Sequence, residues 1–246
     1  MRTEDLQDMA YSDREIAEKT QTIYSHILKY SDTVDAGNYT ALAVSDMELL
    51  FTLYDTAFFH GFFTETYDGR VHFRLSNRMT RAGGKTERCR GSDYFVIVLS
   101  TYLLFQTFQD VRRDIRVNGV VCHDRLEATM RVFEHELVHV LEYIVYDDSS
   151  CLRPRFKRLA RNIFGHTDVT HQLVTTEEVA DKKCGLHVGD RVSFAYDGQR
   201  YDGIISRITK RATVLVKDPA GGFVDIHGTR YAKFYVPLQC LEKKEG

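Results

Sequence analysis

The sequence predicts a protein of the α+β class, in which a mainly helical body is followed by a small all-β domain. Apolar residues recur at spacings of three and four through much of the first two thirds of the chain, a pattern typical of helices. Two short apolar runs between these stretches predict strands. From Gly189 onward the chain changes to short alternating runs separated by turns such as Asp197-Gly198, which predicts a small β-barrel.

The length of 246 residues allows one large domain, or a medium domain with a small one. The hydrophobic share of 43% and the charged share of 28% are those of a globular protein. We expect an N-terminal helical segment at residues 1–44, a central domain at 45–183 and a β-barrel at 187–246. The boundary between the last two is expected near residues 181–185, shortly before the short alternating runs begin at Gly189.

Local signals place the individual elements. Ser12 with Glu15, and Ser45 with Glu48, are expected to form capping boxes at the starts of two helices, and Gly165 is expected to end another. Helices are expected at residues 14–30, 49–59, 102–111, 124–146 and 153–164. Strands are expected at residues 71–79 and 94–100 in the body, and at 191–196, 201–208, 212–218, 223–228 and 233–241 in the barrel. Residues 81–93 are expected to form a turn.

The composition argues against several classes of protein. The first residues are charged and lack the apolar core of a secretory signal, and no apolar run approaches the roughly 18 residues of a membrane helix. The five cysteines form no Cys-x-x-Cys pair, so no disulfide framework is expected. We therefore expect a reducing, cytoplasmic location and no membrane partner.

The charge is unevenly divided along the chain. The net charge is -2, but the part from His187 onward has 10 Lys and Arg against 7 Asp and Glu, a net charge of +3. The remainder therefore has a net charge of -5. This asymmetry indicates that the C-terminal part meets a different partner from the body.

The stretch "VFEHELVHVLEY", residues 132–143, has the strongest chemical signal in the chain. His135 and His139 are four residues apart on a predicted helix, so both imidazoles can reach one Zn²⁺ ion at about 2.0–2.1 Å. Glu136 can then accept a proton from the water that the ion activates. The apolar stripe of this helix lies nearly opposite the two histidines and contains Leu126, Met130, Phe133, Leu137, Leu141 and Ile144.

Two other interpretations compete with a catalytic zinc site. A His-Glu-x-x-His pattern arises by chance in a chain of this length roughly a few times in a hundred, and it would then lie on an ordinary solvated helix face. A structural zinc ion is the second alternative. Such an ion is usually held by four protein ligands that commonly include several cysteines. Only Cys151 lies near the helix in sequence, which favours an open, catalytic site.

From about Leu49 to His171 the chain resembles the SprT-like (Spartan-like) zinc metalloprotease family. The similar segments, in order, are "LFTLYDTAFFHGFF", "VHFRLSNRMTRAGG", "YFVIVLSTYLL", "HELVH" and "PRFKRLARNIFG". The resemblance implies a zincin-like metalloprotease domain with zinc as its cofactor. It also implies that His135 and His139 are zinc ligands and that Glu136 is the general base. The implied substrate is a protein attached to DNA or bound near it, which implies a location close to DNA.

The third zinc ligand departs from the family pattern. The family places a histidine in a Gly-His-Gly-x-x-Phe segment, and the matching "SSCLRPRF" has Leu152 at that position. Cys151 beside it is the preferred substitute, because thiolate binds zinc well and the following helix N-terminus favours the thiolate. Glu142 is too far along the helix, about 10 Å from the first histidine. His166, His171 and solvent remain further alternatives.

The sequence predicts a cleft for an extended peptide. Its lining is expected to include Arg78, Arg81 and the pair Gly83-Gly84, unless these residues form only a turn.

The C-terminal part resembles small SH3-like or KOW-type barrels. Arg200, Arg207, Lys210 and Arg211, with Tyr201 nearby, are expected to contact the phosphates and bases of DNA. A barrel with a purely structural role is the alternative. For the whole chain, the second hypothesis is a catalytically impaired SprT-like protein that serves as a nucleic-acid- or protein-binding module.

Overall fold

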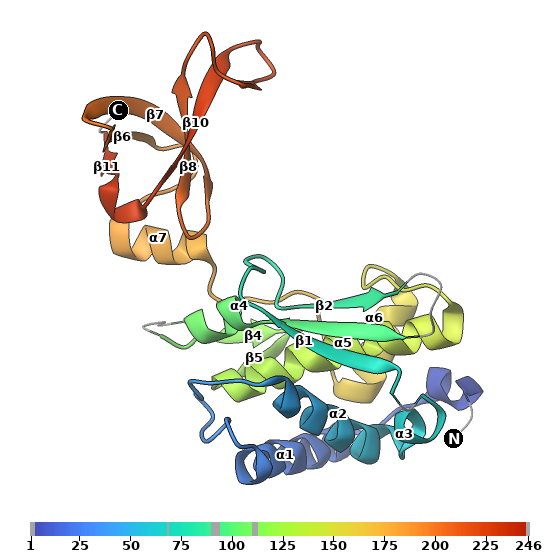
Figure 1. The fold of residues 1–246 in the computed structure, drawn as a ribbon. Coiled ribbons are helices and arrows are strands. Elements are labelled where there is room, and N and C mark those ends of the chain that lie inside the picture. Colours follow the sequence, from blue (N-terminus) through green and yellow to red (C-terminus); the bar gives the residue numbers. More distant parts are fainter. Residues whose placement is uncertain (1–2, 68, 90–93, 110–112, 245–246) are drawn as a thin grey trace. The chain divides into compact units, whose positions relative to one another are not determined.

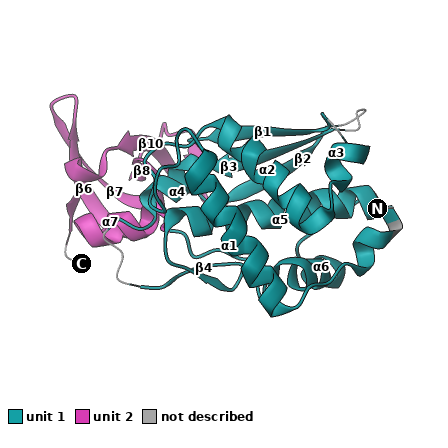
Figure 2. Cartoon of the chain, turned by 90° about the horizontal axis from the view of Figure 1, so that it is seen from below, with its two compact units in different colours: residues 1–173 teal, residues 174–246 magenta. Residues whose placement is uncertain are grey.

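The computed structural model describes residues 3–67, 69–89, 94–109 and 113–244. The chain divides into two compact units, Met1–Leu173 and Val174–Gly246 (Figure 2). This division lies N-terminal to residues 181–185, where the sequence predicts the domain boundary. The reason is that helix α7 (Thr176–Cys184), which the sequence did not predict, contributes Ala180 to the core of the second unit.

Helices dominate the first unit. They are η1 (Thr3–Asp8), α1 (Asp13–Tyr30), α2 (Val44–Phe59), α3 (Phe62–Thr66), α4 (Thr101–Gln106), α5 (Arg125–Tyr146) and α6 (Pro154–Phe164). Helices α1, α5 and α6 begin and end within one residue of their predicted bounds, whereas η1 and α3 were not predicted. The capping box of Ser12 and Glu15 and the left-handed Gly165 at the end of α6 are confirmed. Residues 110–111, expected at the end of the helix that contains α4, lie outside the described part of the chain.

Helix α2 begins earlier than predicted, and its capping residue differs. The side chain of Asp46 accepts a hydrogen bond from the Ala43 amide at 2.6 Å, so the helix begins at Val44 and the box of Ser45 with Glu48 is wrong. Asp46 also accepts a hydrogen bond from the Ser31 hydroxyl at 2.6 Å, which ties the start of α2 to the end of α1. The start of α2 is therefore fixed by the tertiary contact between Asp46 and Ser31 as well as by the local hydrogen bond from Ala43.

The sheet of the first unit has three strands, β1 (Val71–Ser76), β2 (Gly84–Arg88) and β3 (Phe95–Ser100), in the order β1-β3-β2. β1 is parallel to β3, and β2 is antiparallel to it. The predicted strands β1 and β3 are confirmed, whereas β2 falls in the expected turn at 81–93, of which residues 90–93 lie outside the described part. Its sequence, Gly-Lys-Thr-Glu-Arg, lacks apolar residues because β2 is a half-exposed edge strand.

A second pair of strands, β4 (Ile115–Val117) and β5 (Val120–Cys122), was also missed. They form a hairpin whose two turn residues, Asn118 and Gly119, both have positive φ angles. Asn-Gly at such a turn is a strong hairpin signal in a sequence, so this element was open to prediction.

Helix α5 lies at the centre of the first unit, beneath the sheet in Figure 1. It contacts β2 and β3 on the sheet side and α6 elsewhere. The alternative of an ordinary solvated helix face does not hold, because α6 covers that face: the Phe156 ring lies 4.8 Å from the ring of His135 and 4.6 Å from that of His139. Glu134, Glu136 and Glu142 of α5 are all buried.

The second unit contains α7 and a sheet of six antiparallel strands in the order β11-β6-β7-β8-β10-β9. The strands are β6 (Arg191–Tyr196), β7 (Gln199–Ile208), β8 (Ala212–Lys217), β9 (Phe223–Val224), β10 (Arg230–Val236) and β11 (Glu242–Lys243), and the short helix η2 (Leu238–Cys240) precedes β11. Phe194 of β6 lies 5.2 Å from Phe234 of β10, although two strands separate them in the sheet. The sheet is therefore strongly curved around its apolar core.

The fold as a whole is α+β, as predicted. Within the described residues, no helix combines the length and the apolar character that crossing a membrane requires.

Candidate metal centre

Three side chains that can bind a metal ion converge beside α5. His135 and His139 lie one turn apart, and their Nε2 atoms face each other at 3.2 Å. The segment between α5 and α6 brings Cys151 to the same place, so that the three candidate ligand atoms lie within 4.8 Å of one another. This cluster could hold a metal ion.

The geometry and the donor set of the cluster suit zinc. Two nitrogen atoms bound to one tetrahedral zinc ion at about 2.0–2.1 Å lie about 3.3 Å apart, close to the observed 3.2 Å. Burial lowers the pKa of His135 to about 3 and that of His139 to about 4, so both imidazoles are neutral at pH 7 and keep a lone pair for a metal. Two imidazoles and a thiolate are ligands that zinc prefers.

The thiol of Cys151 behaves differently from the expectation. We expected the N-terminus of α6 to favour the thiolate, but burial raises the pKa of Cys151, and the charges of Glu136 and Glu142 add to the increase. In the metal-free protein these effects oppose the expected influence of the helix end. A metal ion that binds to this sulfur must therefore displace its proton.

Glu136 belongs to α5, and its side chain contacts the edge strand β2. Its carboxylate accepts a hydrogen bond from the Thr86 hydroxyl at 2.8 Å, and burial raises the pKa of Glu136 to about 8. The contact with β2 depends on Gly84, because a Cβ atom on that residue would lie 2.6 Å from Glu136 Oε1 and 2.8 Å from a methyl group of Val132. The sequence singled out Gly84 as part of a cleft, but Thr86 was missed because β2 was not predicted.

Replacing Gly84 by Ala should displace Glu136 or the edge strand and lower any activity that depends on Glu136 by at least about tenfold, since small misplacements of reacting groups are costly. The zinc affinity should change far less, because neither residue is in the ligand cluster. Activity and zinc affinity are measured side by side, with Gly222→Ala as the control, since a Cβ atom there would meet nothing within 4 Å. Full activity in Gly84→Ala would show that this close contact is not needed.

The other candidates for the third ligand lie elsewhere. Leu152 is 77% exposed, so its side chain points to solvent and a histidine placed there is not expected to complete the cluster. His166 is buried and pairs with Glu134, Nε2 to Oε2 2.7 Å. His171 Nε2 accepts a hydrogen bond from the Gly83 amide at 3.1 Å. Glu142 is buried beneath the segment that contains Cys151 and is not a member of the ligand cluster.

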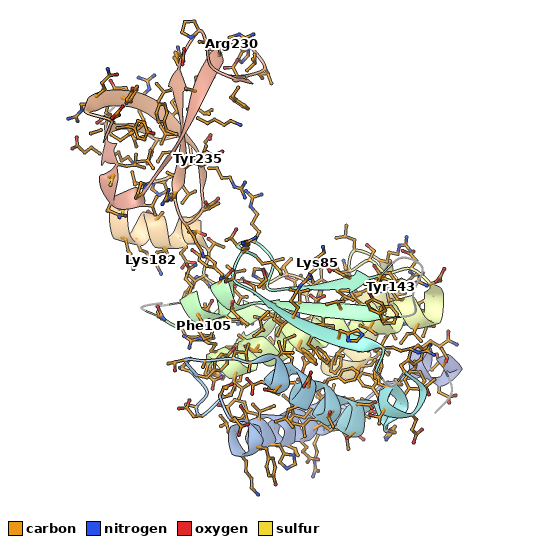
Figure 3. All side chains as sticks on the ribbon, in the orientation of Figure 1. Lys85, Phe105, Tyr143, Lys182, Arg230 and Tyr235 are labelled. Carbon is orange, nitrogen blue, oxygen red and sulfur yellow. The ribbon has the colours of Figure 1, made fainter. Side chains whose placement is uncertain are left out.

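The arginines expected near a substrate cleft are only partly brought together. Arg78 lines a pocket on the sheet face that also includes Arg74 and Lys85, and Figure 3 labels Lys85 on its strand. The backbone carbonyl of Arg81 lies 3.1 Å from His171 Nε2. Arg78 and Arg81 therefore belong to different surroundings.

In the second unit, the predicted nucleic-acid contacts are dispersed. Arg200 forms an exposed ion pair with Glu242, and Tyr201 packs against Phe194 and Phe234. Arg207 lies near the end of β7, opposite Thr213 of β8. Lys210 and Arg211 lie in the turn between these two strands.

The site thus combines a mixed sheet, a central helix with two histidines four residues apart, and a cluster that could hold a metal ion. The model of the SprT-like family matches residues 47–177, more than half of the chain. The chain therefore belongs to the SprT-like family, which is associated with zinc metallopeptidases. A comparison with curated proteins found no match.

Proposed function

We propose that the protein is a zinc-dependent metallopeptidase of the HExxH type, and that it hydrolyses peptide bonds in proteins. The observation that carries this proposal is the convergence of His135, His139 and Cys151 at a spacing that suits one tetrahedral ion. When bound, a zinc ion supplies Lewis acidity that lowers the pKa of a water molecule and polarises a carbonyl group.

The side chains around the cluster have separate roles in this proposal. His135, His139 and Cys151 hold the ion. Glu136 follows the first histidine and is not a ligand. Burial keeps Glu136 largely protonated at pH 7 in the metal-free chain, and the charge of a bound zinc ion would favour its carboxylate form, which takes a proton from the attacking water and returns it to the leaving amine. Its hydrogen bond from Thr86 fixes the carboxylate on the side of the edge strand.

The edge strand β2 offers a place for the substrate. β2 has a hydrogen-bonded neighbour on one side only, and it contacts α5 beside Glu136. An extended peptide can add to such an edge through main-chain hydrogen bonds. In this proposal the peptide lies along β2, so that one of its carbonyl groups reaches the metal centre.

The direct test is cleavage of an unfolded protein by the purified chain before and after metal removal. We expect a chelator to stop cleavage and stoichiometric zinc to restore it. Cleavage that is unaffected by complete metal removal would refute the proposed function.

The second unit supports a second candidate function, nucleic-acid binding, and we propose that its curved sheet closes as an SH3-like barrel. The specific observation is the strand register, which places Arg191, Ile204, Leu215 and Lys233 in one row across four strands. Their side chains lie on the face opposite the core, because the neighbouring Val192, Ile205 and Val214 belong to the core and Phe234 packs against it.

We call this surface the outer sheet face, and it also includes Arg207, Thr213, Lys217 and Tyr235. Arg191, Arg207, Lys217 and Lys233 have no ion-pair partner within the described residues. Tyr235, labelled in Figure 3, is 66% exposed. Lys233 lies over the Phe223 ring, 4.2 Å from its centroid. Cations on the same face as an exposed ring suit a phosphate backbone and a stacked base. The proposed substrates are accordingly proteins bound to DNA in the cytoplasm.

Affinity for single-stranded DNA should fall steeply with salt, because the contacts are electrostatic. With about four phosphate contacts, we expect a loss of roughly 50-fold between about 50 and 200 mM salt. Fluorescence anisotropy of the full chain measures this, and both Arg191→Glu with Lys233→Glu and Arg207→Ala with Arg211→Ala should weaken binding further. Lys183→Glu is the control for a general loss of positive charge, because Lys183 is exposed on α7 and does not belong to the outer sheet face.

The result also separates the two hypotheses for the whole chain. DNA binding without metal-dependent cleavage would favour the catalytically impaired binding module. Cleavage without DNA binding, even at low salt, would leave an acidic protein segment or a structural role for the outer sheet face.

A further inference from the structure

A chain of hydrogen bonds extends from the metal centre to a buried carboxylate on the same helix. His139 Nδ1 lies 2.6 Å from the Ser149 hydroxyl, which donates to Glu142 Oε2 at 2.7 Å. The Glu142 side chain has no exposed surface and also accepts hydrogen bonds from the Ser150 amide at 2.9 Å and from Arg155 Nε at 2.8 Å. No residue of this network belongs to the ligand cluster except His139.

The directions of these hydrogen bonds follow from the number of protons available. The guanidinium of Arg155 and the Ser150 amide both donate to Glu142, which makes the carboxylate an acceptor. The Ser149 hydroxyl has one proton, and it donates that proton to Glu142. The hydroxyl oxygen must therefore accept a hydrogen bond from His139, so the ring of His139 has its proton on Nδ1.

This tautomer is the one that metal binding requires. A neutral imidazole with its proton on Nδ1 keeps the lone pair on Nε2, and His139 Nε2 is the atom that faces the cluster. Partners behind a ligating histidine commonly fix its tautomer and orientation in this way. His135 lacks such a partner, because its buried Nδ1 has no hydrogen bond to any protein group in the described residues.

The same carboxylate also holds the segment that contains Cys151. The Ser150 amide, directly before Cys151, is fixed by Glu142. Arg155 donates to Glu142 and, at 2.7 Å, to the Asp148 carbonyl, so the carboxylate ties both ends of the connection between α5 and α6. A shift of Glu142 would therefore move His139 and Cys151 together.

We propose that Glu142 is a positioning residue of the metal centre, which acts on His139 through Ser149 and on Cys151 through the backbone of Ser150. The inference rests on the proposed function only in assigning a metal ion to the cluster; the tautomer of His139 is a property of the metal-free chain. Glu142 itself touches neither substrate nor metal.

The first experiment measures zinc affinity by competition with a chelator of known affinity. Ser149→Ala removes the link to His139 but keeps the contacts of Glu142 with Ser150 and Arg155, and it should weaken zinc binding about tenfold. Glu142→Gln removes the charge that both links use and should weaken it up to about 100-fold. Ser149→Thr keeps a hydroxyl and should restore the affinity. Ser150→Ala is the matched control, since only the backbone of Ser150 takes part.

The second experiment reads the tautomer directly in the metal-free protein. Nitrogen-15 spectra of the imidazoles should show His139 with its proton on Nδ1, and Ser149→Ala should give a mixture of the two tautomers. Because Ser149 is not in a core position, this variant keeps the experiment informative if Glu142→Gln fails to fold.

The outcomes distinguish this inference from the proposed function. Wild-type zinc affinity in Ser149→Ala, or a proton on Nε2 of His139 in the unsubstituted chain, would overturn the inference and leave the peptidase proposal intact. If the chain cleaves no protein but His139 loses its Nδ1 tautomer in Ser149→Ala, the positioning role stands and the peptidase proposal fails.

Discussion

Glu136→Gln should bind zinc as the unsubstituted chain does and yet lose peptide-bond cleavage. General acid–base catalysis typically contributes about 10²–10⁴-fold, so kcat/KM should fall by about that factor. Glutamine keeps the shape of the side chain and can still accept a hydrogen bond from Thr86, but it cannot take a proton from water. Zinc content and single-turnover cleavage of an unfolded protein, measured on one preparation, separate the two properties.

The control for this variant is Glu134→Gln, one residue before His135. Glu134 pairs with His166 and Arg131 in the core, away from the ligand cluster, so its loss should lower stability and affect both zinc binding and cleavage only through unfolding. Cleavage at the normal rate by Glu136→Gln would show that another group accepts the proton.

Cys151→Ser should lower zinc affinity by more than the roughly 10–100-fold that substitutions behind the ligands cost. The serine hydroxyl is close in size to the thiol, but it does not become an anion at neutral pH and binds zinc poorly. Cleavage at limiting zinc should fall in parallel and recover in part with excess metal. Cys151→His, which supplies another nitrogen donor, should bind zinc better than Cys151→Ser.

The matched control is Cys184→Ser, because Cys184 is exposed on α7 and belongs to no ligand cluster among the residues that the structure describes. Equal zinc affinities for Cys151→Ser and Cys184→Ser would remove Cys151 from the metal centre and leave a site of two histidines and solvent.

Much of the fold was predictable because its signals are local. Helix α5 has one apolar stripe and an Asp124 cap, and α6 has Pro154 at its start and Gly165 at its end, so their bounds follow from propensity and capping. β2 was not predictable in the same way. Its five residues carry no apolar alternation, and it becomes a strand only because β3 offers a hydrogen-bonding edge.

The candidate site also combines residues that local patterns predict with residues that depend on tertiary contacts. His135 and His139 could be paired from the sequence, because helix geometry alone places residues i and i+4 on one face. The choice between Cys151 and Leu152 depends on a one-residue rotation of the segment after α5, which no periodicity reports. Glu142 was excluded as a ligand on distance, but its role behind His139 depends on Ser149 and Arg155 folding back over it.

X-ray absorption at the zinc edge of the loaded protein tests the central claim most directly, because it counts the donor atoms around the ion. We predict one sulfur at about 2.3 Å and two imidazole nitrogens at about 2.0–2.1 Å, with one further light atom from solvent. The sulfur signal should vanish in Cys151→Ser and persist in Cys184→Ser. A shell of nitrogen and oxygen alone in the unsubstituted protein, or a shell of several sulfurs, would contradict a metal centre made of His135, His139 and Cys151.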